Sequence, residues 1–277
     1  MNSWRSVLAD IERTGTPLGR RRSGLCSIEG LRLHERALRA GATIEAVLVG
    51  ASFLASPAPR TRRLLEELAR SGVEPQLAPD EVLATLTQGR GLGAIVGLVR
   101  IPRPVALEQA LAASPLTPPV LLAAIGIADP GNTGALVRTA HASGAAALLT
   151  APPTDPYHPR AIRTSMGSLF KLAVIAYPEA ERLLAGLAAA AVRSCAAVSS
   201  GGTALPECEF AAGAWCVLLG SEAEGLPHDV LARVERQVRV PMVPGVDSLS
   251  ANAAAAVLLY AVAHRRSGCA GQGGALG

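Results

Sequence analysis

Residues 120–264 alternate short apolar runs with segments of helical periodicity. We predict strands at residues 120–127, 145–149, 192–198, 215–219 and 237–241, and helices at residues 133–142, 179–191 and 251–264. Strands that alternate with helices in this way are typical of a parallel sheet with helices on both faces. Ligands bind beyond the carboxyl ends of the strands in such sheets, which singles out the loops after Ile127, Leu219 and Pro241.

The first 105 residues show a smaller α/β pattern. We predict helices at residues 28–40 and 61–71, and strands at residues 44–49 and 94–99. A proline-rich stretch near residues 115–119 is typical of a connection between domains. The predicted organisation is therefore a domain at residues 1–105, a linker at 106–119 and a second domain at 120–277.

Charge separates the two predicted domains. The chain has 277 residues and a net charge of +4, but residues 1–105 carry 15 arginines against 10 acidic residues, whereas residues 106–277 carry 11 basic against 12 acidic residues. The excess of arginines over acidic residues in residues 1–105 favours a polyanionic partner for the first domain, although a solvated arginine-rich surface explains it as well.

Composition argues against several other classes of protein. The five cysteines form no CxxC pair, and only five histidines are present, so we expect neither a metal site nor a disulfide framework. No secretory signal is visible at the N-terminus, and the most apolar stretch, residues 251–263, is too short to cross a bilayer. We therefore expect a protein of the cytoplasm that has no membrane partner.

Three loops carry the candidate chemistry, and each has an ordinary explanation by itself. The first contains Pro130-Gly131-Asn132 and leads into a helix that bears Arg138, and by itself it is better explained as a turn, a helix cap at Asn132 and a surface arginine. The second contains Gly220 and Glu222 directly after an apolar strand. The third ends at Ser250, which could simply cap the last helix.

Together and in this order, the loops resemble the three signature motifs of the SpoU (TrmH-like) branch of the SPOUT RNA methyltransferases. The matching residues are Asn132, Gly134, Arg138 and Gly144 in the first motif, Gly220, Glu222, Gly225 and Leu226 in the second, and Val240, Pro241, Met242, Ser248 and Leu249 in the third. Residues 163–170 resemble an internal Arg-x-Ser-x-Gly-Ser segment of the family. The opening Ile28-Glu29-Gly30-Leu31 resembles its ribosomal-protein-like substrate-binding domain.

This resemblance implies the architecture and the chemistry. It implies a SPOUT-type parallel sheet with a C-terminal trefoil knot, a homodimer, and transfer of a methyl group from S-adenosyl-L-methionine to a ribose 2'-hydroxyl of RNA, with rRNA favoured over tRNA. The residues that it implies for cofactor binding are Ser199, Gly220, Val240, Met242 and Leu249. Those that it implies for catalysis are Arg138, Asn132, Glu222, Ser248 and Ser250.

Two alternatives stay open at this stage. A dinucleotide-binding oxidoreductase is suggested by the glycines of residues 89–93, but these precede a predicted strand instead of opening a helix. A non-catalytic RNA-binding protein is suggested by Ser250, because the family pattern reads Ser-Leu-Asn where this chain has Ser248-Leu249-Ser250. The nearby Asn252 lies two residues beyond the expected position.

Overall fold

The computed structural model describes residues 3–55, 58–90 and 94–264. Contacts between Cα atoms divide the chain into two compact units, the first formed by residues 1–103 and 156–171, and the second by residues 104–155 and 172–277. The predicted ranges 1–105, 106–119 and 120–277 differ from this division at two places. Residues 156–171 group with the N-terminal unit, and the predicted linker belongs to the second unit.

The N-terminal unit is built on a four-stranded sheet in the order β1 (Leu25–Glu29), β4 (Ile95–Arg100), β2 (Ile44–Val49) and β3 (Gln76–Leu77). β4 pairs antiparallel with β1 and β2, and β3 pairs parallel with β2. The helical segments of this unit are α1 (Trp4–Thr14), α2 (Pro17–Ser23), α3 (Leu31–Arg39), α4 (Ala51–Ala55), α5 (Pro59–Arg70), α6 (Asp80–Leu86), α9 (Pro159–Thr164) and η1 (Ser168–Phe170).

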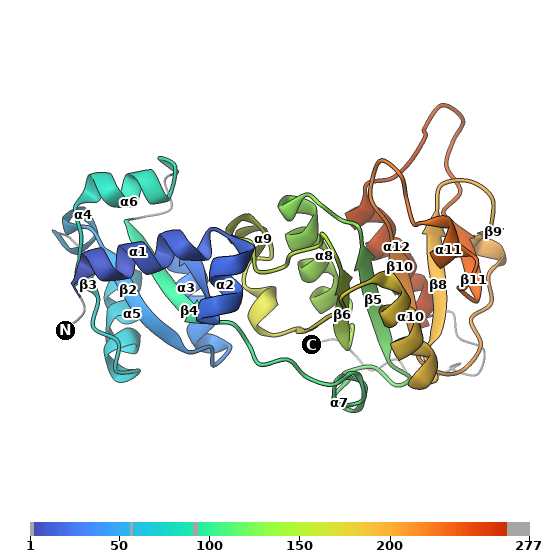
Figure 1. Cartoon of the computed structure of the whole chain (residues 1–277), viewed down its shortest axis with the longest axis horizontal. Helices are drawn as coiled ribbons and strands as arrows, with labels where there is room; N and C mark the ends of the chain where they lie inside the picture. Colours follow the sequence, from blue (N-terminus) through green and yellow to red (C-terminus); the bar gives the residue numbers. More distant parts are fainter. Residues whose placement is uncertain (1–2, 56–57, 91–93, 265–277) are drawn as a thin grey trace. The chain divides into compact units, whose positions relative to one another are not determined.

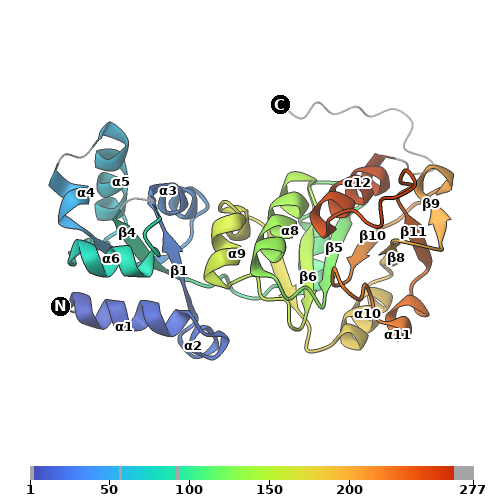
Figure 2. The same cartoon turned by 90° about the horizontal axis from the view of Figure 1, so that it is seen from above.

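Helices cover both faces of this sheet. Val7 and Ile11 of α1 and Leu83 of α6 form one buried cluster with residues of β2 and β4, including Leu48 and Val96. α3 and α5 lie on the opposite face (Figures 1 and 2). Alternate residues of a strand point to opposite faces, so a sheet with helices on both sides needs strands that are apolar throughout.

The predicted helix at residues 28–40 is wrong at its start. Residues 25–29 form β1, and α3 begins only at Leu31. Gly30 lies between the two elements with φ at +79°, in a region that favours glycine. Ile28 is buried as part of strand β1. Its apolar side chain therefore packs in the sheet and does not belong to the apolar face of helix α3.

His34 of α3 is completely buried, and its surroundings keep the imidazole neutral. Its Nδ1 lies 2.8 Å from the carbonyl oxygen of Gly30, which can only accept, so Nδ1 carries the proton. Nε2 has no hydrogen-bond partner and faces Gly97, where an added Cβ would lie 2.6 Å from it. Burial lowers the pKa of His34 from 6.5 to about 4, against the opposing effect of the Gly30 carbonyl.

We therefore predict that acid destabilises the N-terminal unit before its carboxylates titrate. Because the folded pKa lies below the unfolded one, the unfolded state binds the proton first, and stability is lost as pH falls from 6.5 towards 4. Between pH 7 and pH 5 this linkage costs about 2 kcal/mol. Urea titrations at both pH values measure it, and His34→Gln should abolish most of the difference. An unchanged pH dependence in that variant would contradict the assignment to His34.

Residues 156–171 are held on the N-terminal unit by polar contacts as well as by packing. Glu29 of β1 accepts from Arg90 at 2.8 Å and from Arg163 of α9 at 3.5 Å. Arg36 of α3 donates to the carbonyl oxygen of Met166. These contacts involve part of the sequence segment that resembles the internal family motif.

The second unit contains a seven-stranded sheet in which every neighbouring pair is parallel. Its strands, in spatial order, are β7 (Ala173–Ala176), β6 (Ala147–Ala151), β5 (Val120–Ile125), β10 (Trp215–Leu219), β8 (Arg193–Val198), β11 (Arg236–Arg239) and β9 (Thr203–Ala204). Its helical segments are α7 (Leu107–Ala112), α8 (Pro130–Ala142), α10 (Ala180–Ala189), η2 (Leu205–Glu207), α11 (His228–Leu231) and α12 (Ala251–His264).

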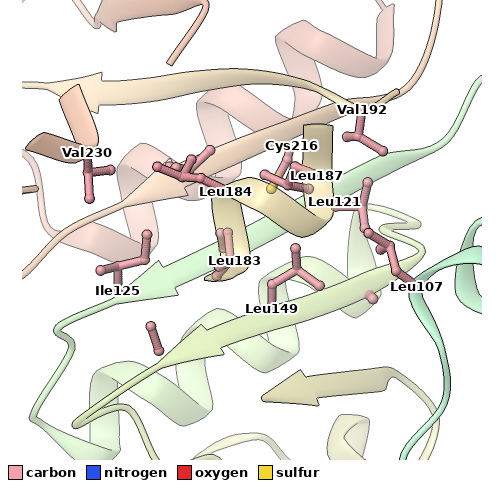
Figure 3. Packing of buried hydrophobic residues seen from close by; sticks show 14 of the residues in the cluster. Leu107, Leu121, Ile125, Leu149, Leu183, Leu184, Leu187, Val192, Cys216 and Val230 are labelled. Carbon is pink, nitrogen blue, oxygen red and sulfur yellow. The ribbon is translucent and has the colours of Figure 1, made fainter. Parts of the chain in front are cut away.

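The main core of the second unit lies under α10. Leu183, Leu184 and Leu187 of this helix pack on the sheet beside Cys216 and Leu149 (Figure 3). Leu107 and Ala110 of α7 are buried in the same cluster, which is why the predicted linker is part of this unit. α8 and α12 pack together on the other face of the sheet (Figures 1 and 2).

The predicted α/β architecture with a parallel sheet is confirmed. The five predicted strands of this unit and its three predicted helices all occur, with ends shifted by at most a few residues. β7 and β9 were not predicted, because they are short and β9 has only two residues. The C-terminal knot remains a prediction.

Candidate functional site

A pocket of about 600 Å³ lies at the carboxyl ends of β8, β10 and β11. The register brings these ends to one edge, because Leu218 pairs with Ala196, and Val198 pairs with Arg239. α12 closes one side through Ala251, Ala254 and Leu258, which are spaced for one helix face. The volume falls within the range of pockets that hold small molecules and cofactors.

All five residues predicted to bind the cofactor line this pocket. Three of the five predicted catalytic residues line it too. These eight residues are Ser199, Gly220, Val240, Met242 and Leu249, and Glu222, Ser248 and Ser250. The sequence reasoning left out several further lining residues, among them Ser221, Leu231 and Gln237. Gln237 was missed because it lies inside a predicted strand, whereas only the loops that follow the strands were considered as sources of site residues.

The geometry of the loop after β10 explains why residues 220 and 225 are both glycines. The loop after β10 folds back on itself, and Ser221 and Gly225 exchange two backbone hydrogen bonds of 3.1 and 2.9 Å. A Cβ at residue 220 would lie only 2.1 to 2.3 Å from backbone atoms of Gly225 and Leu226. Gly225 has φ at +71°, which also favours glycine. Both glycines are therefore needed to close the loop that presents Glu222.

Asn132 meets Glu222 across the edge of the sheet. Its Nδ2 donates to Oε1 of Glu222 at 2.7 Å, which joins the first loop to the second. The predicted capping role of Asn132 is wrong. α8 begins at Pro130, and Asp129 is the cap, because its Oδ1 accepts from the backbone N–H of Asn132 at 2.8 Å. With the backbone satisfied by Asp129, the amide of Asn132 is available for Glu222.

Arg138 makes no hydrogen bond or ion pair with the other predicted catalytic residues in the part of the chain that the structure describes. It is exposed on α8 and is not among the residues that line the pocket. Its guanidinium is a planar group of five donors that can hold an oxyanion. Within one chain, the structure therefore brings together Asn132, Glu222, Ser248 and Ser250, but not Arg138.

The first turn of α12 separates the roles of Ser250 and Asn252. The hydroxyl of Ser250 accepts from the backbone N–H of Ala253 at 3.3 Å, as a cap does. Asn252 instead faces α8, where its Oδ1 accepts from the hydroxyl of Thr139 at 2.6 Å. Sequence reasoning missed the Thr139–Asn252 pair because its members are 113 residues apart.

The chemistry of the site rests on hydroxyls, an amide and a carboxylate. Within residues 3–55, 58–90 and 94–264, no cluster of three or more His, Cys, Asp or Glu side chains could hold a metal ion. Cys26, Cys195, Cys208 and Cys216 are buried, and Cys269 lies outside the described residues. Burial raises the pKa of Cys195 to about 12, so this thiol is not a nucleophile.

The dinucleotide-binding alternative and the expected lack of a membrane span can both be compared with residues that the structure describes. Gly89 and Arg90 follow α6 and precede β4, so they do not open a helix as a dinucleotide-binding loop would, and residues 91–93 lie outside the described part. Among the helices that the structure describes, none is long and apolar enough to cross a bilayer.

Comparisons with known proteins agree with this arrangement. A family model described as the SpoU rRNA methylase family matches residues 119–260. An uncharacterised tRNA/rRNA methyltransferase of Synechocystis sp. is 29% identical over 92% of this chain and 93% of its own length. A 23S rRNA (uridine(2479)-2'-O)-methyltransferase of Streptomyces viridochromogenes is 32% identical, over 50% of this chain and 51% of its own.

One solved structure shows that the fold is shared. The crystal structure of the SpoU methyltransferase AviRb from S. viridochromogenes, in complex with the cofactor AdoMet, aligns with a TM-score of 0.79. The alignment covers 92% of this chain and 97% of that chain at 22% sequence identity.

Proposed function

The chain belongs to the SpoU rRNA methylase family and is thus an RNA methyltransferase, and on that premise we propose that it methylates a ribose 2'-hydroxyl. We propose S-adenosyl-L-methionine as the methyl donor and rRNA, in preference to tRNA, as the substrate. The 2'-O position and the rRNA preference follow the Streptomyces relative, which is named for both. We also propose that the activity belongs to the cytoplasm, where buried thiols such as Cys195 and Cys216 stay reduced.

The observation that carries the proposal is the meeting of three distant loops in one pocket. Residues 199–200, 220–226 and 240–250 all contribute to its lining, although they are far apart in the chain. The pocket combines apolar side chains, such as Leu219 and Leu258, with hydroxyls and a carboxylate. This mixture suits a ligand that joins a flat apolar base to polar and charged groups.

The residues present fit S-adenosylmethionine. The close approach of Gly220 to Gly225 leaves backbone groups, and not side chains, at the end of β10. We assign cofactor binding to Ser199, Gly220, Val240, Met242 and Leu249, all of which line the pocket. When bound, the cofactor supplies a methyl group activated by its sulfonium.

The protein must hold the ribose hydroxyl in place and accommodate the loss of its proton. Glu222 is fixed by Asn132 and lies at the pocket, where its carboxylate can accept a hydrogen bond from a ribose hydroxyl. Ser248 and Ser250 offer further hydroxyl contacts. A guanidinium stays protonated at neutral pH, so we assign Arg138 to binding the neighbouring phosphate and to stabilising the developing alkoxide.

Because Arg138 does not line the pocket of its own chain, we propose that it serves the pocket of a second copy. α8, which carries Arg138, packs against α12, and α12 leaves Val257 and Tyr260 39% and 66% exposed. Residues three apart share one face of a helix, and neighbouring exposed apolar side chains on one face form the kind of patch that marks an interaction surface. The proposed enzyme is therefore a homodimer in which each Arg138 completes the partner's site.

Transfer of a tritiated methyl group from S-adenosylmethionine to separate rRNA and tRNA fractions tests the proposal. Digestion of the product to nucleosides then locates the label. We expect 2'-O-methylated nucleosides from rRNA. Label on a base, or only in tRNA, would contradict it. Cofactor binding without transfer to either fraction would favour the non-catalytic RNA-binding alternative.

Ser250 and Asn252 provide a prediction about the departure from the family pattern. We expect Ser250→Asn to keep or raise the rate, because it restores the amide of the family motif at the pocket. Asn252→Ala should reduce the rate less than Ser248→Ala does, since Asn252 is bonded to Thr139 and does not line the pocket. Initial rates of the three variants decide this. If Asn252→Ala is as harmful as loss of Arg138 and Ser250→Asn has no effect, the assignment of the third motif is wrong.

A further inference from the structure

One face of the N-terminal sheet concentrates arginines. α3 and α5 together carry seven arginines against three glutamates. On the opposite face, α1 and α6 together carry two arginines against four acidic residues. α2, which packs on α1, adds three arginines, of which Arg20 is buried and donates to the carbonyl oxygen of Thr14. α3 and α5 together therefore carry a net charge of +4 on one face of the sheet, and α2 carries a further +3.

A groove of about 400 Å³ runs between these two helices. Its lining comes from the second half of α3 and the first three turns of α5, namely Glu35, Arg39, Pro59, Arg60, Arg63, Leu64 and Glu67. Arg60 holds Glu35 through two donors, one of them Nε at 2.7 Å from Oε1. Arg39 lies 3.8 Å from the other oxygen of the same carboxylate.

The arginines of this groove exceed the acidic groups that they face. The side chain of Glu35 is only 10% exposed, and Arg60, followed by Arg39 and Arg32, lowers its pKa. The guanidinium-bearing side chains of Arg39 and Arg60 remain 69% and 52% exposed. The lining holds three arginines, Arg39, Arg60 and Arg63, against the two glutamates Glu35 and Glu67, so the groove keeps one cation in excess and guanidinium donors that face solvent.

We propose that this groove between α3 and α5 binds the phosphodiester backbone of the substrate RNA, an inference that rests on the proposed function. A guanidinium fork matches the oxygens of a phosphate. An acidic protein is the less suitable occupant, because Pro59 and Leu64 are the only apolar residues in the lining and no aromatic side chain is available as an anchor. The groove thereby contributes affinity for RNA and no sequence readout.

A matched pair of double variants of the full chain tests this role. Arg39→Gln with Arg63→Gln removes two charges from the groove and leaves Arg60 to neutralise Glu35. Arg21→Gln with Arg22→Gln removes two charges from exposed positions of α2. Thermal unfolding establishes that both proteins are folded. Anisotropy of a labelled rRNA fragment, without cofactor and at several salt concentrations, measures RNA affinity.

We expect the groove variant to bind RNA about tenfold more weakly. The slope of log K against log salt concentration should become roughly 1.5 less steep, as the loss of two phosphate contacts predicts. Its rate at saturating RNA and its affinity for S-adenosylmethionine should stay unchanged, and the α2 variant should bind like the parent. Equal weakening of both variants, or of neither, would overturn the proposal. So would displacement of RNA from the parent by polyglutamate at equal charge concentration. RNA binding is measured without cofactor, so it does not depend on methyl transfer. If the protein binds RNA but transfers no methyl group, the proposed function is wrong, and the two double variants still decide whether the groove binds RNA.

Discussion

Arg138→Ala is expected to reduce methyl transfer by about 10²- to 10³-fold, the usual cost of losing a donor that stabilises developing negative charge. The affinity for S-adenosylmethionine should remain within a few-fold of the parent. The reason is positional, since Arg138 is exposed on α8 and is not among the residues that line the pocket of its own chain. Rates at saturating cofactor and calorimetric cofactor binding measure the two quantities. Full activity of Arg138→Ala would remove the proposed mechanism.

A mixture of two impaired variants, assayed at a cofactor concentration that fills only the intact pocket, determines which chain supplies the arginine. Arg138→Ala retains an intact pocket, whereas a Gly220→Ala chain retains Arg138 but has a disrupted pocket. If Arg138 acts on the partner, mixed dimers regain one working site, and unfolding and refolding the two chains together should restore up to about a quarter of the parental activity. This estimate follows from random pairing into closed twofold dimers. No recovery, with dimers present by light scattering, would mean that each Arg138 serves its own chain.

Gly220→Ala is expected to raise the dissociation constant for S-adenosylmethionine by more than tenfold. The added Cβ would lie 2.1 to 2.3 Å from backbone atoms of Gly225 and Leu226, and backbone cannot rotate away as a flexible side chain can. The loop must therefore open, which displaces Glu222 and the backbone at the end of β10. Calorimetric titration of cofactor measures the change.

Gly213→Ala serves as the matched control, because nothing lies within 4 Å of a Cβ added at residue 213. Its φ of +116° strains an alanine at this position, so the variant controls for a strained glycine substitution in a loop of the same unit. Cofactor affinity should be close to parental in this control. An equal loss in both variants would indicate general destabilisation and would contradict the role of the Gly220–Gly225 contact.

The sequence pattern predicted the second unit well because its buried strands are continuous apolar runs. The end of helix α8 is marked by Gly144, and glycine often follows the last turn of a helix. The lining of the pocket also followed, since in a parallel sheet the loops after neighbouring strands meet at one edge. Two features could not be predicted in this way. The choice of Asp129 over Asn132 as cap depends on where the first helical turn starts, and the Thr139–Asn252 bond depends on how two helices pack.

The same limit applies to the N-terminal unit. Ile28 and Glu29 fit a helical pattern, but pairing with Gly97 and Val96 of β4 makes them a strand. Nothing local in residues 156–171 indicates that Arg163 should reach Glu29, 134 residues earlier in the chain. Local propensity gives way to contacts between distant segments at such places.

The grouping of residues 156–171 with residues 1–103 also constrains how the protein can be made and altered. The ribosome synthesises β1 long before Arg163, so the N-terminal unit cannot acquire its last helical segments until residue 171 has left the exit tunnel. Until then Glu29 has only Arg90 as its ion-pair partner among these residues. Transplanting this unit onto another methyltransferase would accordingly require two separate pieces of chain, and a cut at residue 105 would leave α9 behind without the sheet that supports it.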